Sequence, residues 1–424
     1  MQHLVRAREL LRDFRGESYA FGLEVLDRTG PLAASLGKKA ILIANDSRWA
    51  ATAVQKVASS LAACGVAVVS RCAGSRPNSP IEDVYRIRDA ILGSPADIVV
   101  AVGGGSTIDA AKAANALASL AADTRDIEPL FGVGKVTEML GSRRLRAFVA
   151  VETAASSASH LTRYSNITDL AAARKKLIID DALTPAAAVF DYVTTISAPR
   201  DLTIDGAFDG MSHCLEVYFG AKGDSIDIVE EPALLGVELI VGAIRDALAQ
   251  PTDFAARRLL GFGTDLGGLC IMKGSTSGPH LTSFSLVDVT SHGRATALLG
   301  PYYAVLFAPA IERQLRKLAA IYERCGLPVA DIANLSGREL GLAVACAMMT
   351  LPRILEMPIT LSELPAFTSA HIDRAVDAAR DPAIAVKLQA MPVPMNTDMV
   401  DEYMRPLLEA AASGDLAKVP TLKV

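Results

Sequence analysis

The stretch that decides the fold is IVVAVGGGSTIDAAK, residues 98–112. Its first five residues are apolar without alternation, which is typical of a strand buried on both faces of a parallel sheet. Three glycines follow, Gly103, Gly104 and Gly105, and a helical pattern begins directly after them. Glycines let a backbone approach a bulky anion, and a helix N-terminus offers it unpaired N–H groups. The stretch therefore predicts a pyrophosphate-binding loop; a plain turn with Ser106 or Thr107 capping the helix is the alternative.

Strand and helix patterns alternate on both sides of this stretch. Apolar runs at 39–44 and 66–70 predict two more buried strands. Segments at 49–64 and 81–92 have helical patterns and predict the helices between the strands. This alternation predicts an α/β fold, in which an N-terminal doubly wound parallel sheet forms a nucleotide-binding domain.

Asp46 follows the strand predicted at 39–44, at the edge where a doubly wound sheet binds nucleotides. A carboxylate at this place can accept hydrogen bonds from ribose hydroxyls and would repel a 2′-phosphate, which favours NAD over NADP. A turn formed by Asn45 and Asp46 is the alternative interpretation.

The pattern changes near residue 201, where strand-like runs stop and long helical patterns take over. We therefore expect two domains: residues 1–198 as the α/β dinucleotide-binding domain and residues 199–424 as an all-helical domain for metal and substrate. The main helices of the second part are expected at 226–249, 253–272, 301–325, 336–355 and 397–413.

Asp209 and His213 stand four residues apart in one of these helical segments. On a helix they share a face, so a carboxylate oxygen and an imidazole nitrogen can approach one divalent cation from the same side. His280 and His292 lie downstream and could complete the ligand set. An exposed hydrogen bond between Asp209 and His213 is the alternative interpretation. His3 and His371 are interpreted as ordinary core or surface residues.

Composition excludes several classes of function. The chain has 424 residues, 51% of them hydrophobic, and a net charge of -5, with no basic stripe for nucleic acid or an anionic membrane. No apolar run approaches the ~20 residues that a membrane span needs. The six cysteines form no CxxC pair, so we expect reduced thiols in the core, for example at Cys64 and Cys346. A polar N-terminus without a signal sequence predicts a cytoplasmic enzyme.

Taken together, the motifs resemble the iron-containing (group III) alcohol dehydrogenases of the dehydroquinate synthase-like superfamily. The run from Gly103 to Lys112 is close to that family's GGGS-x-x-D-x-x-K signature. Residues 183–185, 190–191, 199 and 209–213 follow its order and approximate spacing, and 292–301 resembles its last metal-binding histidine region. The resemblance covers roughly residues 35–325.

The resemblance implies a role for each matching residue. The metal ligands, and with them the catalytic centre, would be Asp209, His213, His280 and His292. The cofactor would be NAD, with one divalent metal, Fe(II) or Zn(II) first, and the chain would form a homodimer or larger homo-oligomer. The residues implied in cofactor binding are Asp46, Gly103, Gly104, Gly105, Ser106, Asp109, Thr153, Ser157 and Lys175.

Some positions depart from the family pattern. The G-T-G part of the family's cofactor loop is replaced here by Ser157-Ala158-Ser159, and His160 stands where an acidic residue is usual. We interpret His160 as a surface residue of that loop, with contact to a ligand as the alternative. The family's pair of histidines before the last ligand is reduced to His280, and the second would fall near residues 282–284. Asp288 is either an acceptor that orients an imidazole or a loop carboxylate.

The expected chemistry is hydride transfer between a small alcohol and nicotinamide, with the metal polarising the substrate oxygen. A metal-dependent lyase or cyclase of the dehydroquinate synthase type is the alternative. It would hold a phosphorylated acidic substrate and need several basic residues, of which the helical part offers Arg257, Arg258, Lys273 and Arg294. A nucleotide-binding regulatory module with a decayed metal site is a third reading. It would need a lost ligand, whereas all four candidates are present.

Overall fold

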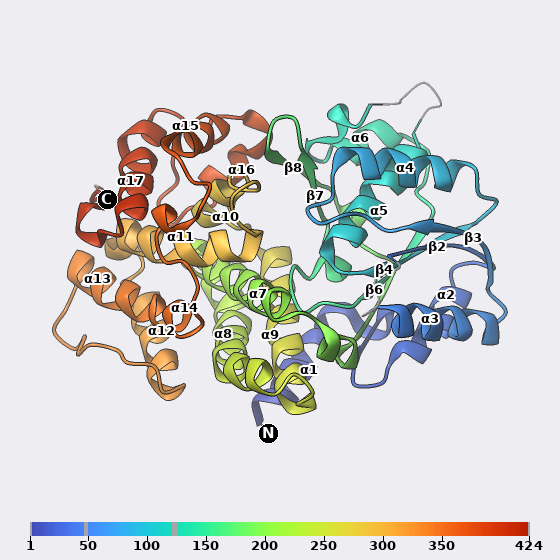
Figure 1. The fold of residues 1–424 in the computed structure, drawn as a ribbon, viewed down its shortest axis with the longest axis horizontal. Coiled ribbons are helices and arrows are strands. Elements are labelled where there is room, and N and C mark those ends of the chain that lie inside the picture. The colour runs from blue at the N-terminus through green and yellow to red at the C-terminus, as the bar shows by residue number, and fades with distance from the viewer. Residues whose placement is uncertain (1, 46–49, 121–125, 423–424) are drawn as a thin grey trace. The chain divides into compact units, whose positions relative to one another are not determined.

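The computed structural model describes residues 2–45, 50–120 and 126–422, so Asp46 lies outside the described residues. The chain divides into two compact units. One comprises Gln2–Thr203 together with Asp246–Gly261, and the other Ile204–Arg245 together with the chain from Phe262 onward. Figure 1 labels most of the helices and strands.

A fully parallel six-stranded sheet, in the order β1-β9-β6-β4-β2-β3, forms the centre of the first unit. Strand β3, which follows β2 in the chain, lies on one side of β2, and β4 lies on the other side. Such a reversal of strand order is where doubly wound sheets bind nucleotides. The strands are β1 (Tyr19–Gly22), β2 (Lys39–Ala44), β3 (Ala67–Ala73), β4 (Ile98–Gly103), β6 (Ala147–Glu152) and β9 (Ala187–Asp191).

Helices cover both faces of this sheet, which explains why β4 is buried along its whole length. Ile41 and Val99 pack into the core beneath α4, α5 and α6, while Leu42 and Val100 pack into the core beneath α2 and α3. The predicted doubly wound α/β fold is confirmed. The covering helices are α2 (Thr29–Ala34), α3 (Ala51–Ala63), α4 (Ile81–Leu92), α5 (Gly105–Ala118) and α6 (Lys135–Leu140).

The first unit also contains elements that the sequence patterns do not predict. A small second sheet has the order β5-β8-β7, in which β7 and β8 form an antiparallel hairpin. The expected strand at 66–70 is observed three residues longer at its end, as β3. The elements that were not predicted are β1, β6 and β9 of the main sheet, the helices α2, α6 and α1 (Gln2–Arg15), and the strands β5 (Gly132–Val133), β7 (Tyr164–Asp169) and β8 (Arg174–Ile179).

The second unit contains only helices and connecting segments among its described residues, which confirms the expected helical C-terminal part. Helices α7, α8 and α9 cross the boundaries between the two units. The helices are α7 (Arg200–Gly220), α8 (Ser225–Ala249), α9 (Phe254–Lys273), α10 (Gly278–Ser283), α11 (His292–Phe307), α12 (Glu312–Arg324), α13 (Gly337–Met348), α14 (Thr350–Ile354), α15 (Ser369–Ala378), α16 (Ala385–Gln389) and α17 (Arg405–Ser413).

Three of the predicted helices were wrong in their limits. The helix expected at 301–325 begins earlier, at His292, and breaks after Phe307 into a 3-10 turn that contains Pro309. The helix expected at 336–355 breaks at Met349, because Pro352 has no N–H to bond the carbonyl of Met348. The helix expected at 397–413 starts with a π-helical turn, Val400–Met404.

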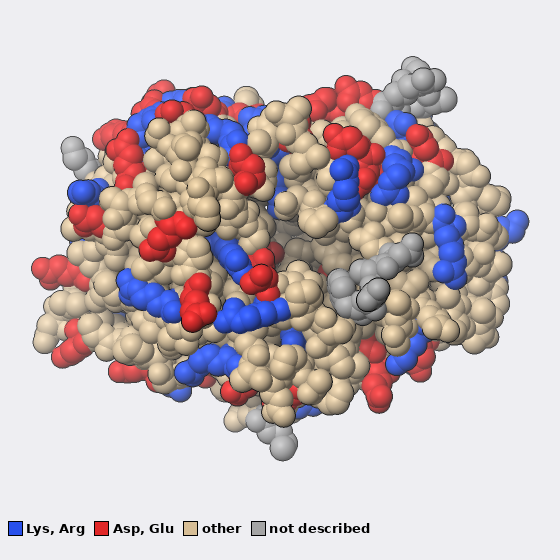
Figure 2. All heavy atoms as spheres, in the orientation of Figure 1, with Lys and Arg blue, Asp and Glu red and all other residues tan. Residues whose placement is uncertain are grey.

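The surface and the cysteines bear on the expected class of protein. On the face shown in Figure 2, acidic and basic side chains are intermixed and form no patch of one sign. None of the helices in the described part of the chain is long and apolar enough to cross a bilayer. All six cysteines are free, but only Cys214 and Cys270 are fully buried. The prediction of core thiols was wrong for Cys64, which is half-buried, and for Cys346, on the outer face of α13.

Candidate functional site

Helix α7 carries the first part of a buried polar cluster. Asp209 and His213 lie one turn apart, with His213 Nε2 3.6 Å from Asp209 Oδ1, and both residues are buried. The helix can be buried here because small residues let it approach α9 closely. A Cβ on Gly210 would come within 2.7 Å of Thr264 Cγ2. A side chain at this position would push the helix that bears the cluster away from its neighbour.

Two histidines from other helices complete the cluster. His280 lies on the short helix α10 and His292 is the first residue of α11; their Nε2 atoms lie 3.5 and 3.6 Å from Asp209 Oδ1. One ligand atom each from Asp209, His280 and His292 lies within 4.8 Å of the other two. The His213 ring stacks on the His280 ring at a centroid distance of 4.8 Å. The structure thus brings all four residues that the sequence nominated to one place.

The ring nitrogens that face away from Asp209 are held by hydrogen bonds. His280 Nδ1 lies 2.5 Å from Glu216 Oε1, and His292 Nδ1 lies 2.9 Å from Ser283 Oγ. Phe284 stacks on the His292 ring at 5.8 Å. Partners of this kind fix the ring orientation and direct the opposite nitrogen to the centre, as is usual around metal-binding imidazoles.

Atoms at the centre of the cluster have the properties of metal ligands. Asp209 Oδ1 and His280 Nε2 are buried and have no hydrogen-bond partner. Leaving such atoms unsatisfied is costly, about 1–3 kcal/mol each. One carboxylate oxygen and three imidazole nitrogens are a donor set suited to a divalent transition metal. The residues present therefore fit the metal that the sequence predicts.

The charges of the cluster also suit a cation. Burial alone would raise the pKa of Asp209, but the surrounding imidazoles, His213 foremost, hold that pKa far below its usual range. Burial lowers the pKa of His213 to about 4, against the attraction of Asp209. Burial would likewise lower the pKa of His280, yet Glu216 and Asp209 raise it. An ionised carboxylate beside an imidazole with a free lone pair is the state that binds metal.

The sequence patterns missed Glu216, Ser283 and Phe284. Glu216 stands seven residues after Asp209 and three after His213, so its place on the same side of α7 as these two residues could have been predicted from the helical period. Ser283 and Phe284 occupy the region where the family's second histidine was expected. Both contact His292 instead. Asp288 pairs with Arg374 and lies 3.5 Å from His371, so the loop-carboxylate interpretation holds.

The predicted phosphate loop lies between β4 and α5 in the other unit. Helix α5 begins at Gly105, with Gly104 at the N-cap and no side chain capping it, so the alternative interpretation, a cap by Ser106 or Thr107, was wrong. A Cβ on Gly105 would overlap with Ser157 Oγ. The third glycine is therefore required by the segment that crosses over it, and the first turn of α5 keeps unpaired N–H groups.

The crossing segment runs from Glu152 to His160. The Thr153 N–H donates to the Gly103 carbonyl at 3.2 Å, which joins the two loops. Ala158 has a left-handed backbone, φ 50°, in the part where the family has glycine. His160 is 1% exposed, between Glu152 Oε2 at 3.3 Å and the Tyr19 hydroxyl at 3.0 Å, so the surface interpretation was wrong. Its partners sit within the fold.

Asp109 and Lys112 hold this segment against α5. The buried Asp109 carboxylate accepts hydrogen bonds from Ser159 Oγ and from the backbone N–H of Asn166. The buried Lys112 ammonium donates to three carbonyls, those of Ser159, Thr162 and Tyr164, at 2.5, 2.7 and 3.0 Å. Burial lowers the pKa of Lys112 to about 8. Asp109 and Lys112, which belong to the family signature, thus fix the position of the loop. Lys175, which is also buried, lies on β8.

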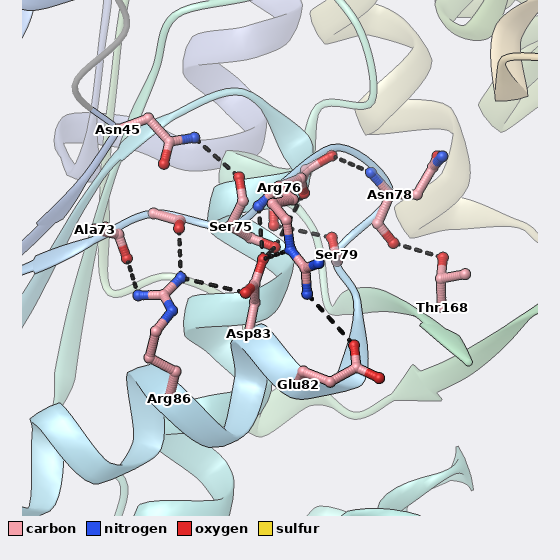
Figure 3. Close-up of polar contacts among 12 residues, drawn as sticks. Asn45, Ala73, Ser75, Arg76, Asn78, Ser79, Glu82, Asp83, Arg86 and Thr168 are labelled. Carbon is pink, nitrogen blue, oxygen red and sulfur yellow. Dashed lines mark hydrogen bonds and ion pairs between the residues drawn. The ribbon is translucent and has the colours of Figure 1, made fainter. Parts of the chain in front are cut away.

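A second loop, residues 73–80, lies beside the phosphate loop (Figure 3). The Asn78 N–H donates to Ser106 Oγ at 3.1 Å, and Ser79 Oγ donates to the Ser106 carbonyl at 2.9 Å. Asn78 and Ser79 both have left-handed backbones, with φ 67° and 51°. Thr168 from β7 holds the turn by donating to the Asn78 carbonyl. Strained backbone of this kind clusters at ligand sites.

Comparison with known proteins identifies the family to which the chain is similar. Residues 16–192 match the family model described as "Iron-containing alcohol dehydrogenase", and residues 203–407 match "Fe-containing alcohol dehydrogenase family, C-terminal". Alcohol dehydrogenase 4 of Saccharomyces cerevisiae is 29% identical over 58% of this chain, a match that covers 63% of that protein, less than two thirds. The NAD-dependent methanol dehydrogenase of Bacillus methanolicus is 26% identical over 78% of this chain and 83% of that protein. A crystal structure of 1,3-propanediol oxidoreductase, 23% identical, has a TM-score of 0.77 and covers 93% of this chain and 97% of that one.

Proposed function

Because this chain belongs to the iron-containing alcohol dehydrogenase family of oxidoreductases, we propose that it is a metal-dependent, NAD-linked alcohol dehydrogenase. It would interconvert a small alcohol and its carbonyl compound. The observation that carries the proposal is the buried cluster of Asp209, His213, His280 and His292, in which one carboxylate oxygen faces three imidazole nitrogens at 3.5 to 3.6 Å. The metal would be Fe(II) or Zn(II), both compatible with mixed oxygen and nitrogen ligands.

The four cluster residues would hold the metal, which when bound supplies a Lewis acid for the substrate oxygen. The residues around it have separate tasks. Glu216 accepts from His280 Nδ1 and so directs Nε2 to the centre. Ser283 does the same for His292. A single carboxylate among neutral imidazoles leaves a positive centre with any divalent ion, which suits an oxygen that gains negative charge.

The cofactor would bind along the phosphate loop of the other unit. Gly103, Gly104, Gly105 and Ser106 would receive the pyrophosphate at the start of α5, where backbone N–H groups are unpaired. Thr153, Ser157 and Lys175 would contribute further contacts, with Asp109 acting through the loop that it holds. NAD is favoured over NADP on the expectation for Asp46 and on the name of the Bacillus methanolicus relative. We also propose, as the sequence predicts, that the boundary between the two domains lies near residue 198 and that the chain forms a homo-oligomer.

The basic residues that the sequence analysis named for a lyase give that interpretation little support. Two of the basic side chains that it would need have structural partners. Arg257 is buried and donates to Thr203 Oγ1 and to the Pro251 carbonyl. Arg294 pairs with Asp205 at 2.8 Å.

The first test combines metal content with turnover. Protein purified without oxygen would be analysed for metal and assayed by NADH absorbance on short alcohols, diols, aldehydes and hydroxy acids. We expect one metal per chain and reversible reduction of NAD with at least one short alcohol. One metal and bound NAD without net turnover would instead favour the lyase.

Substitution of the ligands separates the two sites. Asp209→Asn and His213→Ala should each remove bound metal and activity, because each deletes a donor at the centre, while NAD binding stays nearly intact. The checks are metal analysis and fluorescence titration with NADH. Loss of NADH binding with metal retained would overturn the ligand assignment.

A further inference from the structure

A buried lysine from the C-terminal part of the chain stands close to the metal cluster. Lys387 lies on α16, far from the cluster in sequence, and is only 3% exposed. Its ammonium donates to Thr276 Oγ1 and lies 5.5 Å above the centre of the Phe284 ring. A lysine this deeply buried is rare unless its charge is compensated.

Both partners of Lys387 are neighbours of the proposed ligands. Thr276 precedes Ser277, whose N–H donates to Glu216 Oε2 at 2.7 Å. Phe284 stacks on His292. Lys387 thus contacts Phe284, which stacks on the proposed ligand His292, and Thr276, which adjoins the residue that donates to Glu216.

The charge of Lys387 acts on the cluster. Burial lowers the pKa of Lys387 to about 8, with Glu216 opposing the shift, so the ammonium is still mostly protonated at neutral pH. The centre of the Phe284 ring, 5.5 Å from the Lys387 ammonium, lies 5.8 Å from that of the His292 ring, so the buried ammonium lies near the proposed ligands. A positive charge at this place opposes a metal cation at the cluster by Coulomb repulsion.

A count of charges shows what the lysine changes. Asp209 and Glu216 carry one negative charge each, and a divalent ion would make that group neutral. Lys387 adds one positive charge to it. In a buried site this excess is poorly screened by solvent or salt.

We propose that Lys387 is a remote charge that weakens divalent-cation binding at the cluster and, in return, makes the bound cation more electron-withdrawing. This inference rests on the proposed function. Because Lys387 acts through Glu216 and the ligands, it is a positioning residue and not a catalytic one. Its consequence would be a more acidic substrate alcohol.

The test measures cation affinity and does not depend on turnover. Metal-free protein would be titrated with Zn²⁺ and Co²⁺ against a chromophoric chelator. Lys387→Met keeps the length of the side chain and removes the charge, and should bind these ions more tightly, on the order of tenfold. Lys387→Arg keeps the charge and should bind as the parent does. Thr276→Val removes the hydrogen bond of Lys387 but leaves its charge, and should bind no more tightly than the parent.

The direction in which cation affinity changes distinguishes an effect of the Lys387 charge from a purely structural role of its side chain. If Lys387 only supported the fold, the methionine variant would bind cations more weakly, and that result, or unchanged binding, would overturn the proposal. Lys387→Gln gives the same change of charge with a polar head for Thr276, should the methionine variant not fold. Failure of the unmodified protein to bind either ion would instead overturn the metal assignment itself.

Discussion

One oxygen atom, Oδ1 of Asp209, links three histidines that come from three helices. Without a cation, this buried carboxylate must be stabilised by imidazoles that lie beyond good hydrogen-bond distance, at 3.5 to 3.6 Å. Two of these atoms have no hydrogen-bond partner at all. We therefore expect an ion bound at the centre of the cluster to stabilise the fold, and the folded protein should be less stable when the ion is removed.

Glu216→Gln tests how much metal affinity depends on the hydrogen bond that orients His280. The amide keeps the size of the side chain but loses the charge that holds His280 Nδ1. Outer partners of metal-bound histidines typically contribute about 10–100-fold to metal affinity, and we expect a loss in that range. The measurement is competition with a chelator. Glu238→Gln on α8, whose carboxylate pairs with Arg324, is the control and should bind metal normally. Equal losses in both variants would contradict the role of Glu216.

Among the elements, helix α4 fixes the loop beside the proposed phosphate site through its residue Asp83. Asp83, in the first turn of α4, points into the loop 73–80, with Arg76 and Arg86 on either side (Figure 3). It accepts from the Arg76 N–H at 2.8 Å and Nε at 3.1 Å. Burial alone would raise the pKa of Asp83, but these hydrogen bonds and the charges of Arg76 and Arg86 keep it below its usual value.

Asp83→Asn should therefore destabilise the protein in a pH-dependent way. A carboxyl whose pKa is lowered by folding stabilises the folded state above its unfolded pKa, about 3.9, and loses that contribution as the pH falls through its folded value. We expect a cost of about 1–2 kcal/mol in the free energy of unfolding at neutral pH, shrinking below about pH 3. Urea titrations at both pH values provide the check. The exposed Glu82→Gln should change stability by less than about 0.5 kcal/mol. A cost for Asp83→Asn that does not change with pH would rule out the charge as its origin.

The elements differ in how well the sequence predicts them. Strands β2 and β4 were correctly predicted because a continuous apolar run suits a strand buried on both faces, and helix α4 because its apolar residues repeat the helical period. Helix 301–325 was not, because an apolar periodicity continues across Pro309 although the helix does not. The hairpin of β7 and β8 was missed since β8 begins with charged residues such as Arg174 and Lys176, which interrupt the apolar pattern of a strand.

The proposed ligands and the glycine loop could be predicted from the sequence, whereas the residues that contact and orient them could not. Asp209, His213 and the glycine loop have fixed local spacing, which a single sequence reveals. Lys387 and Ser283 reach the cluster only through folding, and no local period connects Lys387 with Thr276. His160 was misjudged because its partners, Tyr19 and Glu152, come from separate strands. Contacts between distant segments need coordinates.

At the scale of the whole molecule, the proposed metal ligands and the proposed cofactor loop belong to different units of the chain. Removal of metal with a chelator should therefore speed hydrogen exchange first in α7, α10 and α11, with β2 and β4 little affected. Added NAD should slow exchange around β4 and α5 instead. Mass spectrometry of exchanged peptides would measure both. Equal changes in all of these peptides after chelation would contradict separate sites.

The α/β unit is not one continuous piece of chain, and this has a consequence for dissecting the protein. Residues Asp246–Gly261 belong to it, although some forty residues of the other unit precede them. Arg257 donates to Thr203, and Gly261 packs so closely on the Tyr192 ring that a Cβ would overlap with it. A fragment ending at residue 203 would thus expose the groove where this segment belongs. We expect the fragment to be insoluble alone and to be rescued by supplying the missing segment as a separate peptide, which would make the protein a split pair that reassembles only when both pieces are present.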